Sequence, residues 1–241
     1  MAGAALIPID LSNSVAVITG AGSGIGRATA VMAASVGLEV AAWDIDEATA
    51  EQSAKEISGS WHRVDVADAD QVARAFAGLD RPARYLVNNA GPPSAAPTAF
   101  VDGLEKGAGS VEVVTRLWLE TSPPEPAAIV NVASVAGNML GAEPGWYAAT
   151  KGAIGGYTRH LAVRHKGRVR ANAVAPGMIA TPRSLAFSES PQLEAALARN
   201  PIGRMGQPEE VAWAILFLLS PGAGYVNGTV LAVDGGWTIT P

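Results

Sequence analysis

Three side chains near the middle of the chain have the types and the spacing for proton transfer. Tyr147 and Lys151 lie four positions apart, and Ser134 precedes Tyr147 by thirteen positions. Residues four apart share one face of a helix, so the Lys151 ammonium can lie close to the Tyr147 phenol. A free phenol has a pKa near ~10, and a neighbouring positive charge lowers it. The pattern predicts an acid/base at Tyr147, with Ser134 placed to hold a substrate oxygen against it.

A glycine-rich turn near the start of the chain is the second chemical feature. It runs Thr19-Gly20-Ala21-Gly22-Ser23-Gly24-Ile25-Gly26, after an expected strand and before an expected helix. This context is the one in which such a turn binds a dinucleotide. Glycine lets the backbone approach a pyrophosphate, and the first N–H groups of the helix are free to bind it. The residues of this turn expected to bind cofactor are Gly20, Ser23, Gly24, Ile25 and Gly26.

Asp44 indicates which dinucleotide binds. It ends the second expected strand, about 20 residues beyond the turn, where a carboxylate can accept hydrogen bonds from ribose hydroxyls. The same carboxylate would repel a 2′-phosphate, and Ile45 follows it rather than a basic residue. The expected cofactor is therefore NAD.

Apolar runs alternate with helical periodicity along the chain. The expected strands are 14–19, 39–44, 61–66, 84–88, 128–133, 168–174 and 229–233. The expected helices include 24–36, 47–57, 68–77, 147–165 and 208–219, and the segments expected to be irregular are 91–110, 123–126 and 181–206. This order favours parallel β-α units. We expect one α/β domain over 1–241 with a doubly wound parallel sheet of about seven strands, binding ligands at the carboxyl ends of the strands.

Composition excludes several other classes of function. A net charge of -5 disfavours a nucleic-acid partner, and the absence of cysteine excludes thiolate catalysis. The histidines His62, His160 and His165 lack metal-ligand spacing, so we expect no metal site. The first basic residue is Arg27 and the most apolar stretch, 211–219, is too short to span a bilayer. We therefore expect a cytoplasmic protein with no membrane partner.

With these motifs in place, the chain resembles the short-chain dehydrogenase/reductase family over nearly its whole length, which implies a Rossmann-type fold. Besides the glycine turn and the Ser134, Tyr147 and Lys151 set, the resemblance rests on Asn88-Asn89-Ala90-Gly91, Pro176-Gly177 followed by Thr181, and Val233-Asp234-Gly235-Gly236. It implies that Tyr147 and Lys151 also touch the cofactor, with Lys151 on the nicotinamide ribose. The remaining cofactor contacts that it implies are Asp65, Val66, Asn89, Ala90, Gly91, Pro176, Gly177, Ile179 and Thr181.

One position departs from the family pattern. The family carries a further catalytic Asn about 27 residues before its Ser, and that position here is Gly107. The small residues around Gly107 weaken a helix. We therefore expect 91–110 to be irregular and mobile without ligand, and Gly107→Asn to raise the rate little. The proton would then leave by water or another polar group.

The substrate is less clearly indicated. Candidate pocket residues are Pro92, Pro93, Met139, Leu140, Trp146, Met178, Leu185 and Phe187, with Arg183 as the one candidate for holding an anion. The mostly apolar set favours a lipophilic secondary alcohol or ketone, cyclic or steroid-like. A 3-oxoacyl carrier ketoreductase and a catalytically impaired nucleotide sensor remain as alternatives. Apolar segments at 211–219 and 229–241 indicate a homo-oligomer, a tetramer or else a dimer.

Overall fold

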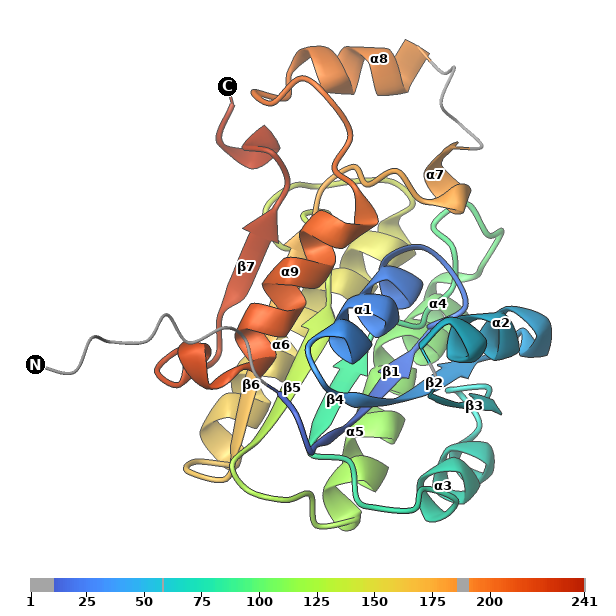
Figure 1. Ribbon diagram of the computed structural model, residues 1–241. Coiled ribbons are helices and arrows are strands. Elements are labelled where there is room, and N and C mark those ends of the chain that lie inside the picture. The colour runs from blue at the N-terminus through green and yellow to red at the C-terminus, as the bar shows by residue number, and fades with distance from the viewer. Residues whose placement is uncertain (1–10, 58, 186–190, 241) are drawn as a thin grey trace, which may run out of the picture.

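A seven-stranded parallel sheet forms the centre of the computed structural model, which describes residues 11–57, 59–185 and 191–240 (Figure 1). The strands follow the order β3-β2-β1-β4-β5-β6-β7 across the sheet. They are β1 (Val15–Thr19), β2 (Glu39–Asp44), β3 (Ser60–Arg63), β4 (Tyr85–Asn88), β5 (Ala127–Val132), β6 (Val169–Pro176) and β7 (Val230–Val233). The order reverses between β1 and β4, which creates a crevice at the carboxyl ends of the strands. The predicted fold class is confirmed.

Helices cover both faces of this sheet. One face carries α1 (Gly24–Ser35), α2 (Glu47–Ile57) and α9 (Pro208–Leu219), and the other carries α3 (Ala69–Ala77), α5 (Ser110–Glu120) and α6 (Gly145–Arg164) (Figure 1). Each face has its own hydrophobic core, because the central strands are buried on both sides. Among the described residues, no helix has the length and apolar character needed to cross a bilayer.

The predicted helix starts depend on local capping. The Asp68 carboxylate accepts hydrogen bonds from the backbone N–H groups of Asp70 and Gln71, both at 3.0 Å, at the start of α3. Asp46 accepts from Thr49 N at 3.0 Å in the same way before α2. These contacts satisfy amides that a helix start leaves without partners.

The segment around Gly107 is helical, contrary to the prediction of an irregular stretch. The helix α4 (Phe100–Leu104) continues through a π-helical turn, η1 (Glu105–Gly109), directly into α5. A Cβ on Gly103 would lie 2.5 Å from Trp146 Cε3, and one on Gly107 would overlap Thr150 Cγ2. The glycines therefore permit close packing of this helix on α6. The prediction rested on the low helix propensity of these glycines. Packing against α6 stabilises the helix by more than that propensity costs.

The loop after β6 also contains more helix than expected. Two short helices, α7 (Pro182–Leu185) and α8 (Pro191–Ala198), lie within the 181–206 segment that was expected to be irregular. A hydrogen-bonded cluster fixes the start of α7, where the Ser184 hydroxyl donates to Ile179 O at 2.5 Å and accepts from Thr181 N at 2.9 Å. This cluster determines where the side chains of α7 lie.

A chain of buried amides and hydroxyls joins α5 and α6 to the sheet. The Asn88 Nδ2 atom donates to Thr115 Oγ1 at 3.0 Å and to Asn131 Oδ1 at 2.9 Å. The Asn131 Nδ2 atom in turn donates to Thr158 Oγ1 at 2.9 Å. Because an unpaired polar group is costly in this interior, the network fixes α6 in one position on the sheet.

Candidate active site

The glycine turn is held in place by Asp44 and Asn89. The Asp44 Oδ2 atom accepts a hydrogen bond from Gly22 N at 2.8 Å, which ties the end of β2 to the turn. The Asn89 side chain donates to Thr19 O at 3.0 Å and Gly20 O at 3.1 Å. A Cβ on Gly20 would meet Asn89 Nδ2 at 2.7 Å, and φ is 65° at that residue. At position 20 only glycine has both the backbone conformation and the space that this turn requires.

Tyr147 and Lys151 lie one turn apart on α6, and Ser134 follows β5. The Lys151 Nζ atom donates to Val132 O at 2.8 Å and lies 5.7 Å from the centroid of the Tyr147 ring. Trp146 is buried and meets the Tyr147 ring edge-on at a centroid distance of 5.8 Å. The three predicted catalytic side chains are thus brought together.

The loop that carries Ser134 is tied directly to α6 by Asn138. The Asn138 Nδ2 atom donates to Ser134 O at 2.9 Å and to Lys151 O at 2.7 Å. Ser134 itself is 8% exposed, and its hydroxyl accepts from Ala136 N at 3.2 Å. One amide therefore fixes the Ser134 loop relative to the helix of Tyr147 and Lys151.

The electrostatics of this group differ from the prediction in one respect. Burial of the phenol raises the pKa of Tyr147, and a hydrogen bond with Ser134 and the charge of Arg183 oppose that rise. The sequence pointed to Lys151 as the source of such a charge and did not indicate Arg183, which lies on α7. Loss of water around the ammonium lowers the pKa of Lys151 to about 8, and Arg183 adds to this effect. The charge of Arg183 therefore acts on both Tyr147 and Lys151.

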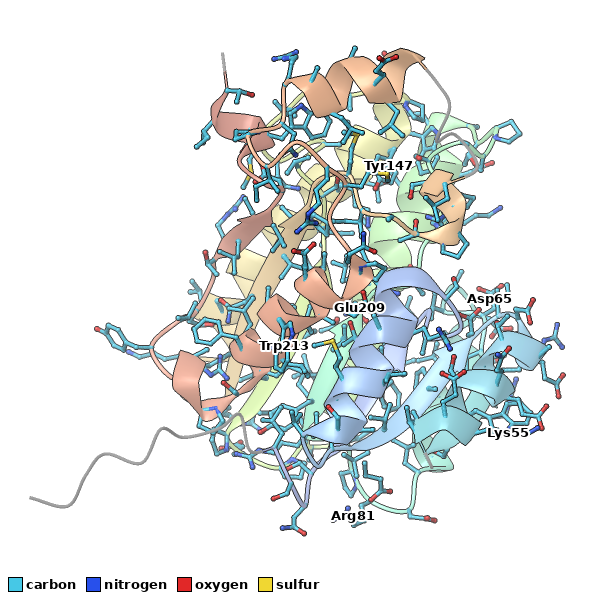
Figure 2. The ribbon with its side chains drawn as sticks, turned by 45° about the horizontal axis from the view of Figure 1, so that its top comes forward. Lys55, Asp65, Arg81, Tyr147, Glu209 and Trp213 are labelled. Atoms are coloured by element: carbon cyan, nitrogen blue, oxygen red, sulfur yellow. The ribbon has the colours of Figure 1, made fainter. Side chains whose placement is uncertain are left out.

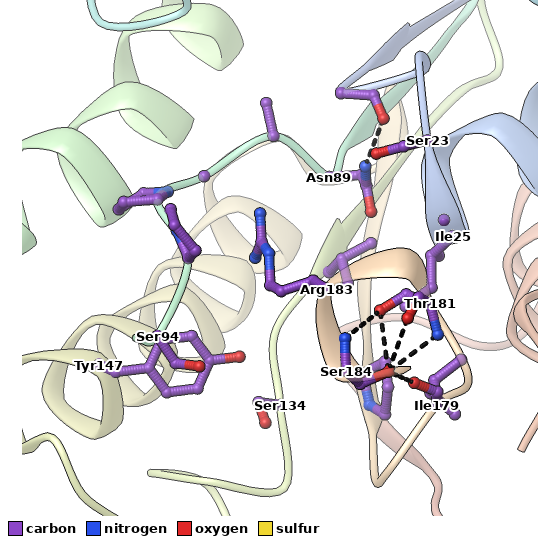
Figure 3. A pocket seen from close by; sticks show the side chains of 18 of the residues that line it. Ser23, Ile25, Asn89, Ser94, Ser134, Tyr147, Ile179, Thr181, Arg183 and Ser184 are labelled. Atoms are coloured by element: carbon purple, nitrogen blue, oxygen red, sulfur yellow. Dashed lines mark hydrogen bonds between the residues drawn. The ribbon is translucent and has the colours of Figure 1, made fainter. Parts of the chain in front are cut away.

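One cavity of about 840 Å³ connects Ser134, Tyr147 and Lys151 with the glycine turn (Figure 3). It lies at the carboxyl ends of the strands, as expected for this fold. The predicted site residues that line it are Gly20, Ser23, Gly24, Ile25, Asp44, Asp65, Val66, Asn89, Ala90, Gly91, Ser134, Tyr147, Lys151, Pro176, Gly177, Ile179 and Thr181. Gly26 is not among the lining residues. It is buried, and a Cβ there would overlap Gly20 O, so its role is in packing the turn.

The predicted substrate pocket is only partly correct. Pro92, Pro93 and Met178 line the cavity. The residues that do not line it are Met139, Leu140, Trp146 and Leu185. Met139 and Leu185 are exposed, and Trp146 is buried against Gly103. Phe187 lies outside the described residues.

The residues that line the cavity are suited to binding a dinucleotide. No side chain caps the first turn of α1, and no acidic residue lies in that turn, so its amide groups and positive helix end are available to a pyrophosphate. Ser23, Gly24 and Ile25 at this helix start all line the cavity. Asp44 lies in the same wall, where it can accept from ribose hydroxyls. These residues would hold the cofactor, which would supply hydride transfer at this site.

Known proteins resemble this chain in both sequence and fold. The family model described as "Enoyl-(Acyl carrier protein) reductase" matches residues 20–238. The cis-4-hydroxycyclohexanecarboxylate dehydrogenase of Sinomonas cyclohexanicum is 40% identical, over 93% of this chain and 96% of that protein. The chain belongs to the short-chain dehydrogenase/reductase family. Relatives named as dehydrogenases and reductases support an oxidoreductase.

Two further members of this family are similarly close. The 3-oxoacyl-(acyl-carrier-protein) reductase FabG of Thermotoga maritima is 38% identical, over 95% of this chain and 99% of that protein. A crystal structure described as an NAD(P)-dependent gluconate 5-dehydrogenase from Beutenbergia cavernae, with NADP bound at low occupancy, is 36% identical. It has a TM-score of 0.87 and covers 97% of this chain and 100% of that one. Structures similar to this chain therefore include one that holds a nicotinamide dinucleotide.

Sequence reasoning missed two residues of this short-chain dehydrogenase site. Lys106 lines the cavity from η1, but its segment was expected to have no regular structure. Asn138 was not singled out, because its role depends on two backbone carbonyls that are distant in the sequence. Its amide side chain, four positions after Ser134, was the only available signal.

Proposed function

We propose that this protein is an NAD(H)-dependent oxidoreductase that interconverts a secondary alcohol and a ketone, with Tyr147 as the acid/base. The observation that carries the proposal is the cavity itself. It has Tyr147, Ser134 and Lys151 in its wall together with the uncapped start of α1. This is the arrangement needed to place a carbinol carbon between a proton acceptor and a hydride acceptor.

The chemistry divides between cofactor and protein. When bound, the nicotinamide accepts the hydride of the carbinol carbon in oxidation and supplies it in reduction. The ionised Tyr147 takes the hydroxyl proton as the C–O bond becomes a carbonyl, and returns it in the reverse direction. Ser134 donates a hydrogen bond to the substrate oxygen, and the Lys151 ammonium favours the phenolate by its charge.

Asp44 supports NAD as the cofactor. Its carboxylate lines the cavity at the end of β2 and is already fixed by Gly22 N. A 2′-phosphate at this place would meet a negative charge that cannot move away without releasing the turn. The structure of the Beutenbergia relative holds NADP, so the proposed preference of this chain for NAD rests on Asp44.

The proposed substrate has a compact, largely apolar body, cyclic in form. Pro92, Pro93 and Met178 give the cavity an apolar wall. The Sinomonas relative is named for a six-membered carbocycle that bears a secondary hydroxyl group. We expect related ring alcohols to fit here, in preference to open chains of similar polarity.

A panel of alcohols with NAD tests the proposal, with NADH formation followed by absorbance. Ring alcohols should give NADH and the matching ketone in equal amounts. If the protein binds NADH but no alcohol is oxidised and no ketone reduced, the nucleotide-sensor alternative is favoured, which the Gly107 departure motivates. If a 3-oxoacyl thioester with NADPH is the better pair, the carrier-ketoreductase alternative is favoured, which the FabG relative motivates.

We also propose that the protein assembles into a homo-oligomer, a tetramer or else a dimer. Trp213 and Phe217 on α9 are 52% and 40% exposed, and Leu231 on the edge strand β7 is 37% exposed (Figure 2 labels Trp213). An edge strand beside exposed apolar side chains is usually covered in folded proteins. Sedimentation at micromolar concentration tests this, and a monomer there would contradict it.

A further inference from the structure

The cavity carries opposite charges at its two ends. Its acidic lining residues, Asp44 and Asp65, follow β2 and β3, whereas its basic ones, Lys106, Lys151 and Arg183, follow β4, β5 and β6. Four strand spacings separate β2 from β6 in the sheet, which is about 19 Å. Figure 2 labels Asp65 on the α2 side of the molecule and Tyr147 further up, below α8. The reaction end of the cavity is therefore the positive end.

Arg183 is one of these charged residues to which the proposed function assigns no role. It extends from α7 into the cavity, and in Figure 3 its guanidinium lies between Asn89 and Tyr147. It forms no ion pair with any other described residue. Its charge nevertheless reaches both Tyr147 and Lys151. Arg183 and Lys151 line the same cavity, and the described carboxylates in its lining, Asp44 and Asp65, lie at the other end, so an anion would stabilise the two positive charges.

The cofactor phosphates have another binding place. The first-turn amide groups of α1 are free for them, at the glycine turn. Arg183 acts instead on the two catalytic side chains, where the substrate binds. Its planar fork of N–H donors matches a carboxylate in two parallel hydrogen bonds. Lys106 adds a second positive charge to the same cavity, from the helix that packs on α6 near Thr150.

On the basis of the proposed function, we propose that Arg183, assisted by Lys106, forms an anion subsite that binds a carboxylate of the substrate. The substrate class is then a hydroxy acid, or the corresponding keto acid, whose secondary alcohol and carboxylate are borne on an apolar skeleton. The apolar wall takes the skeleton, Ser134 and Tyr147 take the hydroxyl group, and Arg183 takes the carboxylate. Arg183 thus determines which substrates bind and is not itself the proton donor or acceptor.

Binding alone tests the subsite without turnover. Calorimetry measures cyclohexanecarboxylate and cyclohexanecarboxamide binding to the protein–NADH complex, for wild type and for Arg183→Gln. Wild type should prefer the carboxylate. Arg183→Gln should lose about tenfold to a hundredfold in carboxylate affinity, the range for a charged hydrogen bond, and little in carboxamide affinity. Arg164→Gln, at the far end of α6, is the matched control and should behave as wild type.

Turnover then tests the substrate class. The probes are 4-hydroxycyclohexanecarboxylate and its carboxamide, which differ in charge and little in size. The ratio of their kcat/KM values should favour the acid at least about tenfold in wild type and approach one in Arg183→Gln. Lys106→Gln should reduce the ratio by a smaller factor, since Lys106 assists Arg183 with a point charge and lacks its planar fork of donors. NADH affinity should stay unchanged in both variants.

The outcomes separate the subsite from the proposed function. Equal use of the acid and the carboxamide by wild type would overturn the subsite and leave the proposed function standing. Carboxylate binding that depends on Arg183, with no oxidation or reduction of any probe, would support the subsite and remove the proposed function. Loss of NADH affinity in Arg183→Gln, with an unchanged carboxylate preference, would assign Arg183 to the cofactor and overturn the subsite.

Discussion

Gly107 of the π-helical turn packs directly on Thr150 of α6, so closely that a Cβ at position 107 would overlap Thr150 Cγ2. Thr150 is 2% exposed, and its hydroxyl donates to Gly103 O at 3.0 Å. The contact positions the helix that carries Lys106 against the helix that carries Tyr147 and Lys151. A residue with no side chain thus helps to set the distance between two walls of the site.

Gly107→Ala should destabilise the protein. In an open helix this change would stabilise by about 1 kcal/mol, but overpacking against a buried side chain costs roughly 1–3 kcal/mol. Thermal or urea unfolding measures the difference. The control is Gly109→Ala on the same turn, where a Cβ would meet nothing nearer than 3.7 Å, and this change should be neutral or stabilising.

Thr150→Ser in the Gly107→Ala background should restore part of the lost stability. It removes Cγ2 and keeps the hydroxyl that donates to Gly103 O. If Gly107→Ala is as stable as Gly109→Ala, the close packing is not what requires glycine. Gly107→Asn should face the same overlap, so it should lower stability and give no large gain in rate.

Asp44→Asn should weaken NADH binding more than NADPH binding. The Asn side chain keeps the shape of Asp but lacks the negative charge that would repel a 2′-phosphate. It is also a weaker hydrogen-bond acceptor for ribose hydroxyls and for Gly22 N. Fluorescence titration with both cofactors measures the ratio of the two dissociation constants. Glu47→Gln, an exposed change nearby on α2, should leave that ratio unaltered. Tighter binding of NADPH than NADH by wild type would contradict the role of Asp44.

Ser134→Ala should shift the pH dependence of alcohol oxidation to higher pH as well as slow it. The Ser134 hydrogen bond opposes the rise in the pKa of Tyr147, so its removal raises that pKa further. Oxidation needs the ionised phenol, and a larger part of the protein is then in the protonated form at a given pH. The profile of kcat/KM against pH should move upward, with a loss in rate of about 10²–10³. An unchanged profile would mean that Ser134 is not coupled to Tyr147.

Lys151 should make stability depend on pH in a defined window. Its pKa is lowered to about 8 in the folded protein, while an unfolded lysine has a value near ~10.4. Between these values the unfolded chain binds more protons, so the contribution of Lys151 to stability increases as pH rises through the window. The melting temperature of wild type relative to Lys151→Met, both without ligand, should therefore increase from pH 8 to pH 10. A difference that stays constant or falls would contradict the lowered pKa.

Most of the fold could be predicted from the sequence, because its signals are local. The helices α2 and α9 begin and end at the predicted residues, and every sheet strand lies within two or three residues of its prediction. Caps such as Asp68 and the proline at the start of α9 mark helix starts by hydrogen bonding and backbone geometry alone. The pairing of Tyr147 with Lys151 was predictable for the same reason, since their spacing is about one helix turn.

The predictions that were wrong concern features that depend on contacts between distant segments of the chain. The helix through Gly107 is stabilised by packing on α6, which residue propensities do not contain. The influence of Arg183 on Tyr147 depends on where α7 lies over the cavity, and its sequence around Pro182 and Ser184 gives no direct sign of that place. Met139 and Leu185 were chosen as pocket residues for their apolar character, but both are exposed away from the cavity lining.

In the proposed reaction, Tyr147 transfers the proton while a carbinol hydride passes to NAD. The most direct measurement is the transfer of deuterium from a ring alcohol labelled at its carbinol carbon, with wild type and Tyr147→Phe compared at equal NAD occupancy. Wild type should place the deuterium in the reduced cofactor in a one-to-one ratio with ketone formed. Tyr147→Phe should bind NADH as wild type does and transfer no measurable deuterium. Transfer at a comparable rate by Tyr147→Phe would contradict the role of Tyr147, and ketone formed without label in the cofactor would contradict hydride transfer to NAD.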